Sequence, residues 1–87
     1  MNVLTPKPSV SAQLLQKYRL DIVGGKYPPG GQFPTVRALA YEESVNPNTM
    51  QRAMSQLEGE GLRITNRTAG RTVTEDITVL EQLRLRL

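Results

Sequence analysis

The segment VNPNTMQRAMSQLEGEGL, residues 45–62, carries polar side chains whose types suit directed hydrogen bonding. Asn48, Thr49 and Gln51 each offer a donor and an acceptor, and Arg52 adds a permanent positive charge. None of these side chains is a nucleophile beside a base, and no pair of carboxylates lies among them. The chemistry that this segment offers is therefore recognition of another molecule through hydrogen bonds and charge.

The same segment has the spacing of an amphipathic helix with a stiffened start. Asn46 is a favoured N-cap residue, and Pro47 suits the first helical position, where its missing N–H leaves no bond unmade. The polar side chains named above are then expected on the open face of a helix over about 47–58. Ordinary helix capping would use the same residues and is a plainer interpretation of the start. The predicted buried stripe recurs at the i, i+3, i+4 and i+7 spacing, as Met50, Ala53, Met54 and Leu57.

The composition excludes several classes of chemistry. The 87 residues include no Cys and no His, which excludes disulfides, Cys/His metal sites, thiol nucleophiles and imidazole catalysis. We expect neither an enzyme nor a cofactor, because no catalytic constellation or cofactor motif is present. The apolar runs are too short to span a membrane, and a chain without Cys fits a reducing compartment, so a cytoplasmic location is expected.

The positive charge is concentrated in one segment. The net charge is +3, and residues 63–71 hold three Arg and no acid. Such a local basic strip is typical of a surface that faces phosphates. A solvated loop is the plainer alternative for Arg63, Arg67 and Arg71.

Two further helices are predicted before this segment. The first begins at a cap formed by Ser9 or Ser11 and ends at a Gly-Gly pair, and the second begins at Thr35 and ends near Ser44. The connector GGKYPPGGQFP holds four Gly and three Pro in eleven residues, so it can be neither helix nor central strand. The expected inward residues are Val10, Leu14, Tyr18 and Ile22 in the first helix, and Val36, Leu39 and Ala40 in the second.

The spacing of the apolar residues changes after the third predicted helix. Residues 62–74, LRITNRTAGRTVT, are rich in β-branched side chains and predict two short strands joined at Ala69-Gly70. The final ITVLEQLRLRL contains T-x-x-E from Thr78 to Glu81, which marks the start of another helix. Its apolar side is expected to form either a dimer contact or packing onto the chain's own core. That side comprises Leu80, Leu83 and Leu87.

This order of elements predicts an α+β, mainly α, winged helix-turn-helix with the start of a C-terminal helix. We expect a flexible N-terminal arm at 1–8, the winged domain at 9–76 and the C-terminal helix at 77–87. In such domains the third helix lies in the DNA major groove with its N-terminal end foremost. Asn and Gln can pair with adenine there, and Thr can contact thymine. A winged domain that serves protein interaction or architecture is the alternative.

Residues 24–74 resemble the DNA-binding domain of the GntR family of bacterial transcription regulators. The resemblance rests on GGKYPPGGQFPTVRALA, VNPNTMQRAMSQLEGEGL and NRTAGRTVTED. The VNPNT and VTED segments are similar to the short YtrA-like branch, whose members carry a small helical tail for dimerisation. The resemblance implies a transcription regulator, and repressor is the expected role. The full-length protein is expected to bind a double-stranded DNA operator as a homodimer. The resemblance identifies no effector.

Carried over by position, the resemblance implies roles for individual residues. Arg37 matches an Arg that touches DNA near the operator bases, and Gly70 matches the wing-tip Gly near the minor groove. Arg52 would clamp a phosphate or pair with an acid such as Glu42. The wing segment RTAGRT lacks one Gly and the aromatic residue of the usual family hairpin, and Gln51 replaces a common Arg. The expected DNA-binding set is Thr35, Arg37, Pro47, Asn48, Thr49, Gln51, Arg52, Arg67, Gly70 and Arg71.

Overall fold

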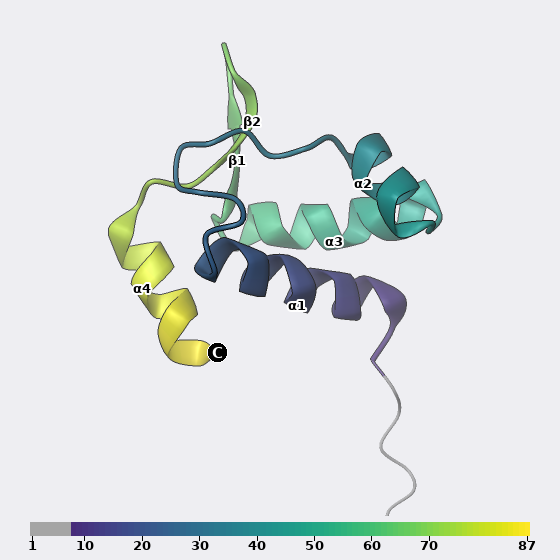
Figure 1. Ribbon diagram of the computed structural model, residues 1–87, viewed down its shortest axis with the longest axis horizontal. Helices are drawn as coiled ribbons and strands as arrows, with labels where there is room; N and C mark the ends of the chain where they lie inside the picture. Colours follow the sequence, from purple (N-terminus) through teal and green to yellow (C-terminus); the bar gives the residue numbers. More distant parts are fainter. Residues whose placement is uncertain (1–7) are drawn as a thin grey trace, which may run out of the picture.

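The computed structural model describes residues 8–87, so the predicted arm at 1–8 lies almost entirely outside the described residues. Figure 1 shows α1 and α3 running side by side, α2 above the start of α3, the hairpin projecting away from the helices and α4 at the opposite end from α2. This is the winged helix-turn-helix that the sequence predicts. The elements are α1 (Val10–Val23), α2 (Val36–Glu43), α3 (Pro47–Gly59), β1 (Arg63–Asn66), β2 (Gly70–Val73) and α4 (Ile77–Arg86).

The predicted N-caps of the first three helices are confirmed. The Ser9 hydroxyl accepts from the amide of Ala12 at 3.1 Å, and the Thr35 hydroxyl accepts from Ala38 at 3.1 Å. The Asn46 side chain accepts from the backbone N–H of Asn48 at 2.7 Å. These bonds satisfy amides that would otherwise be unpaired at each helix start, so the first turn of α3 is fixed before any partner arrives.

The first three helices end in the same way, with one residue in a left-handed conformation. The backbone φ is 88° at Gly25 after α1 and 78° at Gly61 after α3, but the corresponding residue after α2 is Ser44, with φ of 55°. The amide of the next residue, Val45, then donates back to the carbonyl of Ala40 at 3.0 Å. Glycine adopts this conformation without steric cost, whereas serine does not. The turn between α2 and α3 therefore carries local strain.

The core lies between α1 and α3 and is closed by α2 at one end. All four residues of the predicted stripe on α3 are buried, as are Leu39 and Ala40 of α2. The inward stripe of α1 is confirmed from Leu14 onward, but the prediction for Val10 is wrong. Its side chain is 50% exposed, because Val10 is the first helical residue and the buried stripe begins one turn later.

The hairpin pairs β1 with β2 in antiparallel register, with Asn66 opposite Gly70. The turn occupies the residues between them, where the Asn66 side chain accepts from the amides of Thr68 and Ala69 at 3.0 and 3.1 Å. These bonds close the turn at the tip of the hairpin. The connector also pairs with β2, since the amide of Phe33 donates to the carbonyl of Arg71 at 2.8 Å. The wing is thereby fixed to the helices at its base.

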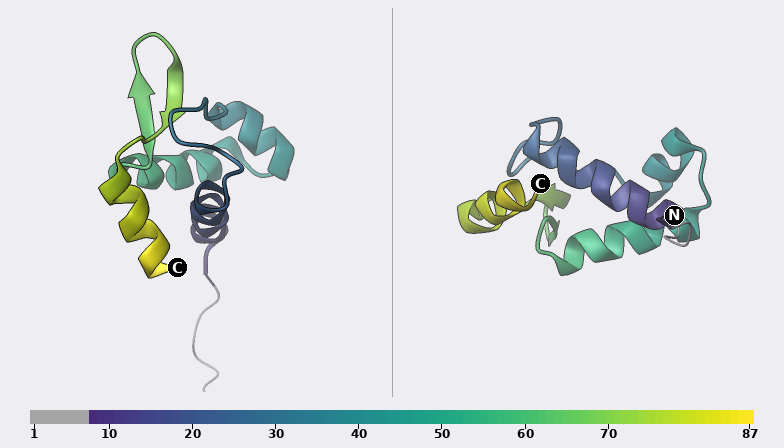
Figure 2. Two further views of the ribbon diagram at one scale, coloured as in Figure 1. Left: turned by 60° about the vertical axis from the view of Figure 1, so that its left-hand side comes forward. Right: turned by 90° about the horizontal axis from the view of Figure 1, so that it is seen from below.

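The C-terminal helix begins at Ile77, but the T-x-x-E pattern does not supply its cap. Asp76, not Thr78, is the N-cap, because its carboxylate accepts from the amide of Thr78 at 2.9 Å. Leu83 is buried in the core and Leu80 is partly buried, whereas Leu87 is 44% exposed. The helix packs against α1 (Figure 2). Among the described residues, no helix is both long enough and apolar enough to cross a membrane.

Candidate nucleic-acid interface

The start of α3 presents most of its predicted polar side chains to solvent. Pro47, Asn48, Gln51 and Arg52 are exposed, whereas Thr49 is half-buried. Because Asn46 holds the first turn through its own hydrogen bond, the exposed side chains extend from a rigid backbone. The open face predicted for this helix is therefore present, with Thr49 at its margin.

Gln51 is already engaged within its own helix. Its side-chain amide donates to the hydroxyl of Ser55 at 2.9 Å, one helical turn further on. This bond aligns the amide along the helix surface and leaves its carbonyl oxygen as an acceptor. Arg52 lies on the neighbouring face, and no ion pair joins it to Glu42 in the described part of the chain. The alternative that Arg52 pairs with Glu42 is not what the structure shows.

Two of the predicted DNA-binding residues lie at the start of α2, and they differ in whether their side chains are free to contact a partner. The hydroxyl of Thr35 is used to cap α2, although the residue is exposed. Arg37, in the first turn of the same helix, is also exposed. Of these two residues, Arg37 is therefore the one whose side chain can extend freely toward a partner.

A hollow of about 340 Å³ joins α2, α3 and the base of the wing. We call it the wing hollow. It brings together Arg37, Gln51 and Arg71, which lie far apart in the sequence. Its full lining is Thr35, Val36, Arg37, Gln51, Glu58, Arg63 and Arg71.

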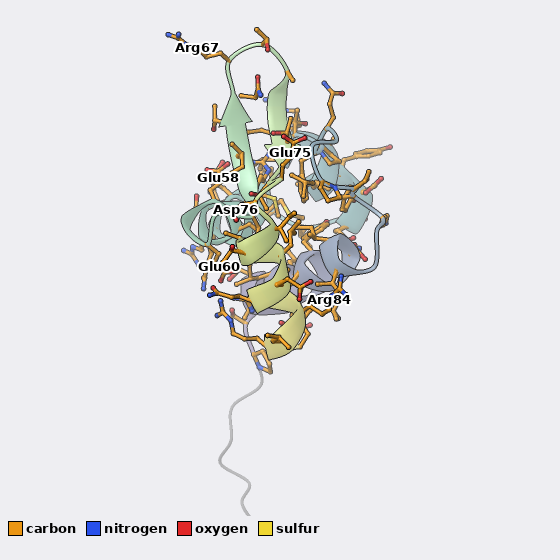
Figure 3. The ribbon with its side chains drawn as sticks, turned by 90° about the vertical axis from the view of Figure 1, so that its left-hand side faces the viewer. Glu58, Glu60, Arg67, Glu75, Asp76 and Arg84 are labelled. Atoms are coloured by element: carbon orange, nitrogen blue, oxygen red, sulfur yellow. The ribbon has the colours of Figure 1, made fainter. Side chains whose placement is uncertain are left out.

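The two exposed arginines of the wing have different positions. Arg67 lies at the tip and points away from the body of the protein (Figure 3). Arg71 lies on β2 beyond Gly70, and its Nε is 3.5 Å from Oε2 of Glu58 on α3. Strand pairing of Thr65 with Arg71 places Arg71 below the turn, and its contact with Glu58 directs it toward the third helix.

The sequence position of Arg63 predicted that it belongs to an exposed basic strip. The structure shows that it does not. It is 3% exposed, forms an ion pair with Glu58, donates to the carbonyl of Pro34 at 3.0 Å and lies 5.4 Å from the centre of the Phe33 ring. Burial lowers the pKa of its guanidinium, and the hydrogen bond that Arg63 donates to Glu58 opposes that effect. Arg63 is therefore a structural cation, because its contacts hold it inside the fold.

Sequence reasoning did not identify Glu58 as a site residue, although it contacts both Arg63 and Arg71. Figure 3 places it near the base of the wing. One signal was available: Glu58 follows Gln51 by seven residues on a helix, so the two share a face. Its partners could not be assigned, because both arise from strands that only the tertiary fold brings to α3.

Comparison with known proteins places this geometry in a family. Residues 10–73 match the family described as "Bacterial regulatory proteins, gntR family". The chain is 37% identical over 59 residues to the uncharacterized HTH-type transcriptional regulator YhcF of Bacillus subtilis, which covers 68% of this chain and 49% of that protein. It is 36% identical over 64 residues to the HTH-type transcriptional repressor YtrA of the same organism, covering 74% and 49%.

A solved structure of a regulator from the same family is also similar to this chain. A GntR family transcriptional regulator from Listeria monocytogenes superposes with a TM-score of 0.82 at 34% identity, covering 99% of this chain and 73% of that chain. The chain spans about half the length of the two Bacillus relatives, 49% in each case. The likeness therefore concerns the winged domain and the start of the segment that follows it.

Proposed function

The chain belongs to the GntR family of bacterial regulatory proteins, and from that premise we propose that it reads a specific operator sequence, with α3 in the major groove and the wing at the minor groove. The observation that carries this proposal is the rigid polar start of α3, which opens beside the same hollow as Arg37 and Arg71. Short amides and hydroxyls can reach base edges, and arginines on both sides can neutralise phosphates.

Within this proposal the residues divide by role. Asn48, Thr49 and Gln51, with Pro47 beside them, read base edges, and Gln51 favours adenine over the guanine that Arg would favour. Arg37 contacts DNA next to the bases that α3 reads. Arg52, Arg67 and Arg71 contact phosphates, and Gly70 lets the wing backbone approach the minor groove. Thr35 contributes mainly by holding the start of α2 in place, since its hydroxyl is already bonded.

We further propose that the protein acts as a homodimeric repressor in the bacterial cytoplasm. One relative of similar identity is named a transcriptional repressor, which supports this role. A dimer would contact half-sites separated by about 34–36 Å, one helical turn of DNA. Exposed apolar residues of α4, Ile77 and Leu85, are available for a contact between copies.

Selection of binding sites from random DNA duplexes tests this function. A specific regulator enriches one motif, and a dimer enriches two inverted copies at a fixed spacing. Affinity for the selected site should fall steeply with salt, because phosphate contacts release counterions. If no motif is enriched and low salt yields no duplex binding, the domain serves protein interaction or architecture instead.

A further inference from the structure

We propose that Glu58 is a positioning residue for DNA binding: anchored by buried Arg63, it holds Arg71 against α3 in the free protein and yields it to a phosphate of the duplex. This inference rests on the proposed function and adds a residue that the family resemblance does not assign. Glu58 approaches both arginines through the same oxygen, Oε2.

The two ion pairs of Glu58 differ in strength. Arg63 is buried, and its guanidinium has few other partners: the Pro34 carbonyl and the face of Phe33. Removing the carboxylate from a buried guanidinium is costly, so the Glu58–Arg63 pair persists. The side chain of Arg71 is 44% exposed and its Nε lies 3.5 Å from the carboxylate, a separation that is too long for a strong hydrogen bond. Arg71 is therefore the partner that can leave.

The strands fix which way Arg71 moves. Arg63 pairs with Val73 and Thr65 pairs with Arg71, so both arginines extend from the same face of the hairpin, toward α3. The connector bonds the backbone of Arg71 to Phe33, which prevents the strand from swinging away. Exchange between Glu58 and a phosphate then needs only a side-chain rotation at the wing hollow.

The charges of the wing hollow show why the exchange is favourable. Its lining includes the guanidiniums of Arg37, Arg63 and Arg71 and the single carboxylate of Glu58. Arg63 neutralises Glu58, which leaves the other two cations for phosphate oxygens. Glu58 competes with those oxygens for Arg71, so it lowers affinity while it keeps Arg71 in place.

The test replaces Glu58 by Gln, which keeps an oxygen acceptor for Arg63. Glu58→Gln should tighten binding by about two- to fivefold on both operator and unrelated duplexes, because phosphates are common to both. The slope of log affinity against log salt should become steeper by up to about one unit. Glu60→Gln is the matched control, since it removes the same charge from a residue that pairs with Arg19 of α1. It should change affinity by less than about twofold, because solvent screens the more remote charge.

A second pair of variants asks whether Glu58 acts through Arg71. In an Arg71→Gln background, the gain from Glu58→Gln should shrink toward the gain from Glu60→Gln. An equal gain with and without Arg71, or equal behaviour of the two Gln variants, overturns the inference. Wild-type protein that binds no duplex overturns the proposed function itself, which makes the two failures distinguishable.

A measurement on the wild-type chain covers the case in which Glu58→Gln does not fold. With arginine side chains labelled by ¹⁵N, addition of operator DNA should shift the Nε–H signal of Arg71 and leave that of Arg63 in place. A shift of Arg63 with Arg71 unchanged contradicts the proposed exchange.

Discussion

Arg19 of α1 and Glu60, the residue that follows α3, form a side-on pair in which Arg19 Nε lies 3.0 Å from Glu60 Oε1. A second guanidinium nitrogen of Arg19 donates to the other carboxylate oxygen. Both side chains are about three-quarters covered, with 24% and 23% exposed. The pair therefore ties the middle of α1 to the end of the helix that carries the polar face.

Breaking this pair should loosen the fold without touching the DNA-facing residues. Arg19→Ala should lower the free energy of unfolding by about 1–2 kcal/mol, because a charge-assisted pair is lost and a largely covered carboxylate is left alone. Urea unfolding of Arg19→Ala, Glu60→Ala and the double variant measures the coupling between them. We expect about 0.5–1.5 kcal/mol, and a coupling near zero would show that the pair contributes nothing.

The strained turn after α2 offers a stabilising substitution. Ser44→Gly should raise the free energy of unfolding by about 0.5–1 kcal/mol, since glycine removes the cost of the left-handed conformation but adds flexibility to the unfolded chain. Ser44→Ala keeps the strain and serves as the control, with an expected change within about 0.5 kcal/mol. Thermal unfolding measures both, and equal stability of the two variants would argue against strain at this turn.

Because the phenol of Tyr18 is buried, we expect the stability of the wild type and that of Tyr18→Phe to depend differently on alkaline pH. Burial, followed by the Glu43 carboxylate, raises the pKa of Tyr18 above its ordinary value of 10.0. Above about pH 10 the unfolded chain releases the proton while the folded chain keeps it, so stability falls with pH. Tyr18→Phe should remove this contribution and flatten the decline between about pH 10 and pH 12.

At neutral pH the same variant should be no less stable than the wild type. Within the described residues, the Tyr18 hydroxyl is buried without a hydrogen-bond partner. Its removal should therefore change the free energy of unfolding by between zero and about 2 kcal/mol in the stabilising direction. Chemical unfolding at pH 7 checks this, and a clear loss of stability would mean that the hydroxyl is bonded after all.

Substitutions at Gln51 and Arg67 should affect DNA binding in different ways, because we propose that Gln51 reads a base and Arg67 binds a phosphate. Gln51→Ala should relax the preference at one or two base pairs by about 1–3 kcal/mol, because a side chain that reads a base edge is lost. Arg67→Ala should weaken all duplexes equally and flatten the salt slope by about one unit. Ser55→Ala is a control for Gln51, since it removes the internal partner of the amide but leaves the amide itself. Uniform loss across sequences for Gln51→Ala would contradict a reading role.

Local chemistry was enough to predict most of the fold. The caps at Ser9, Thr35 and Asn46 and the buried stripe of α3 depend on neighbours within one or two turns, so their patterns are complete in the sequence. The N-cap of α4 was misassigned because Asp76 and Thr78 are both good caps, and the chain uses Asp76, the one nearer to β2.

The candidate site could be predicted only in part. The exposed start of α3 follows from helical spacing, but the environment of Arg63 does not. Its carbonyl partner, Pro34, lies 29 residues earlier in the chain, and the strand that carries Arg63 meets it only after folding. The same holds for Arg71, whose direction depends on strand register and on the connector.

The last helix is mechanically coupled to the helix that carries the polar face. Only residues 74–76 separate β2 from α4, and Leu83 is packed into the same cluster as Met54 and Leu57 of α3. Helix α4 packs against α1, and α1 packs along α3. A displacement of α4 is therefore transmitted through α1 to the helix that carries the polar face.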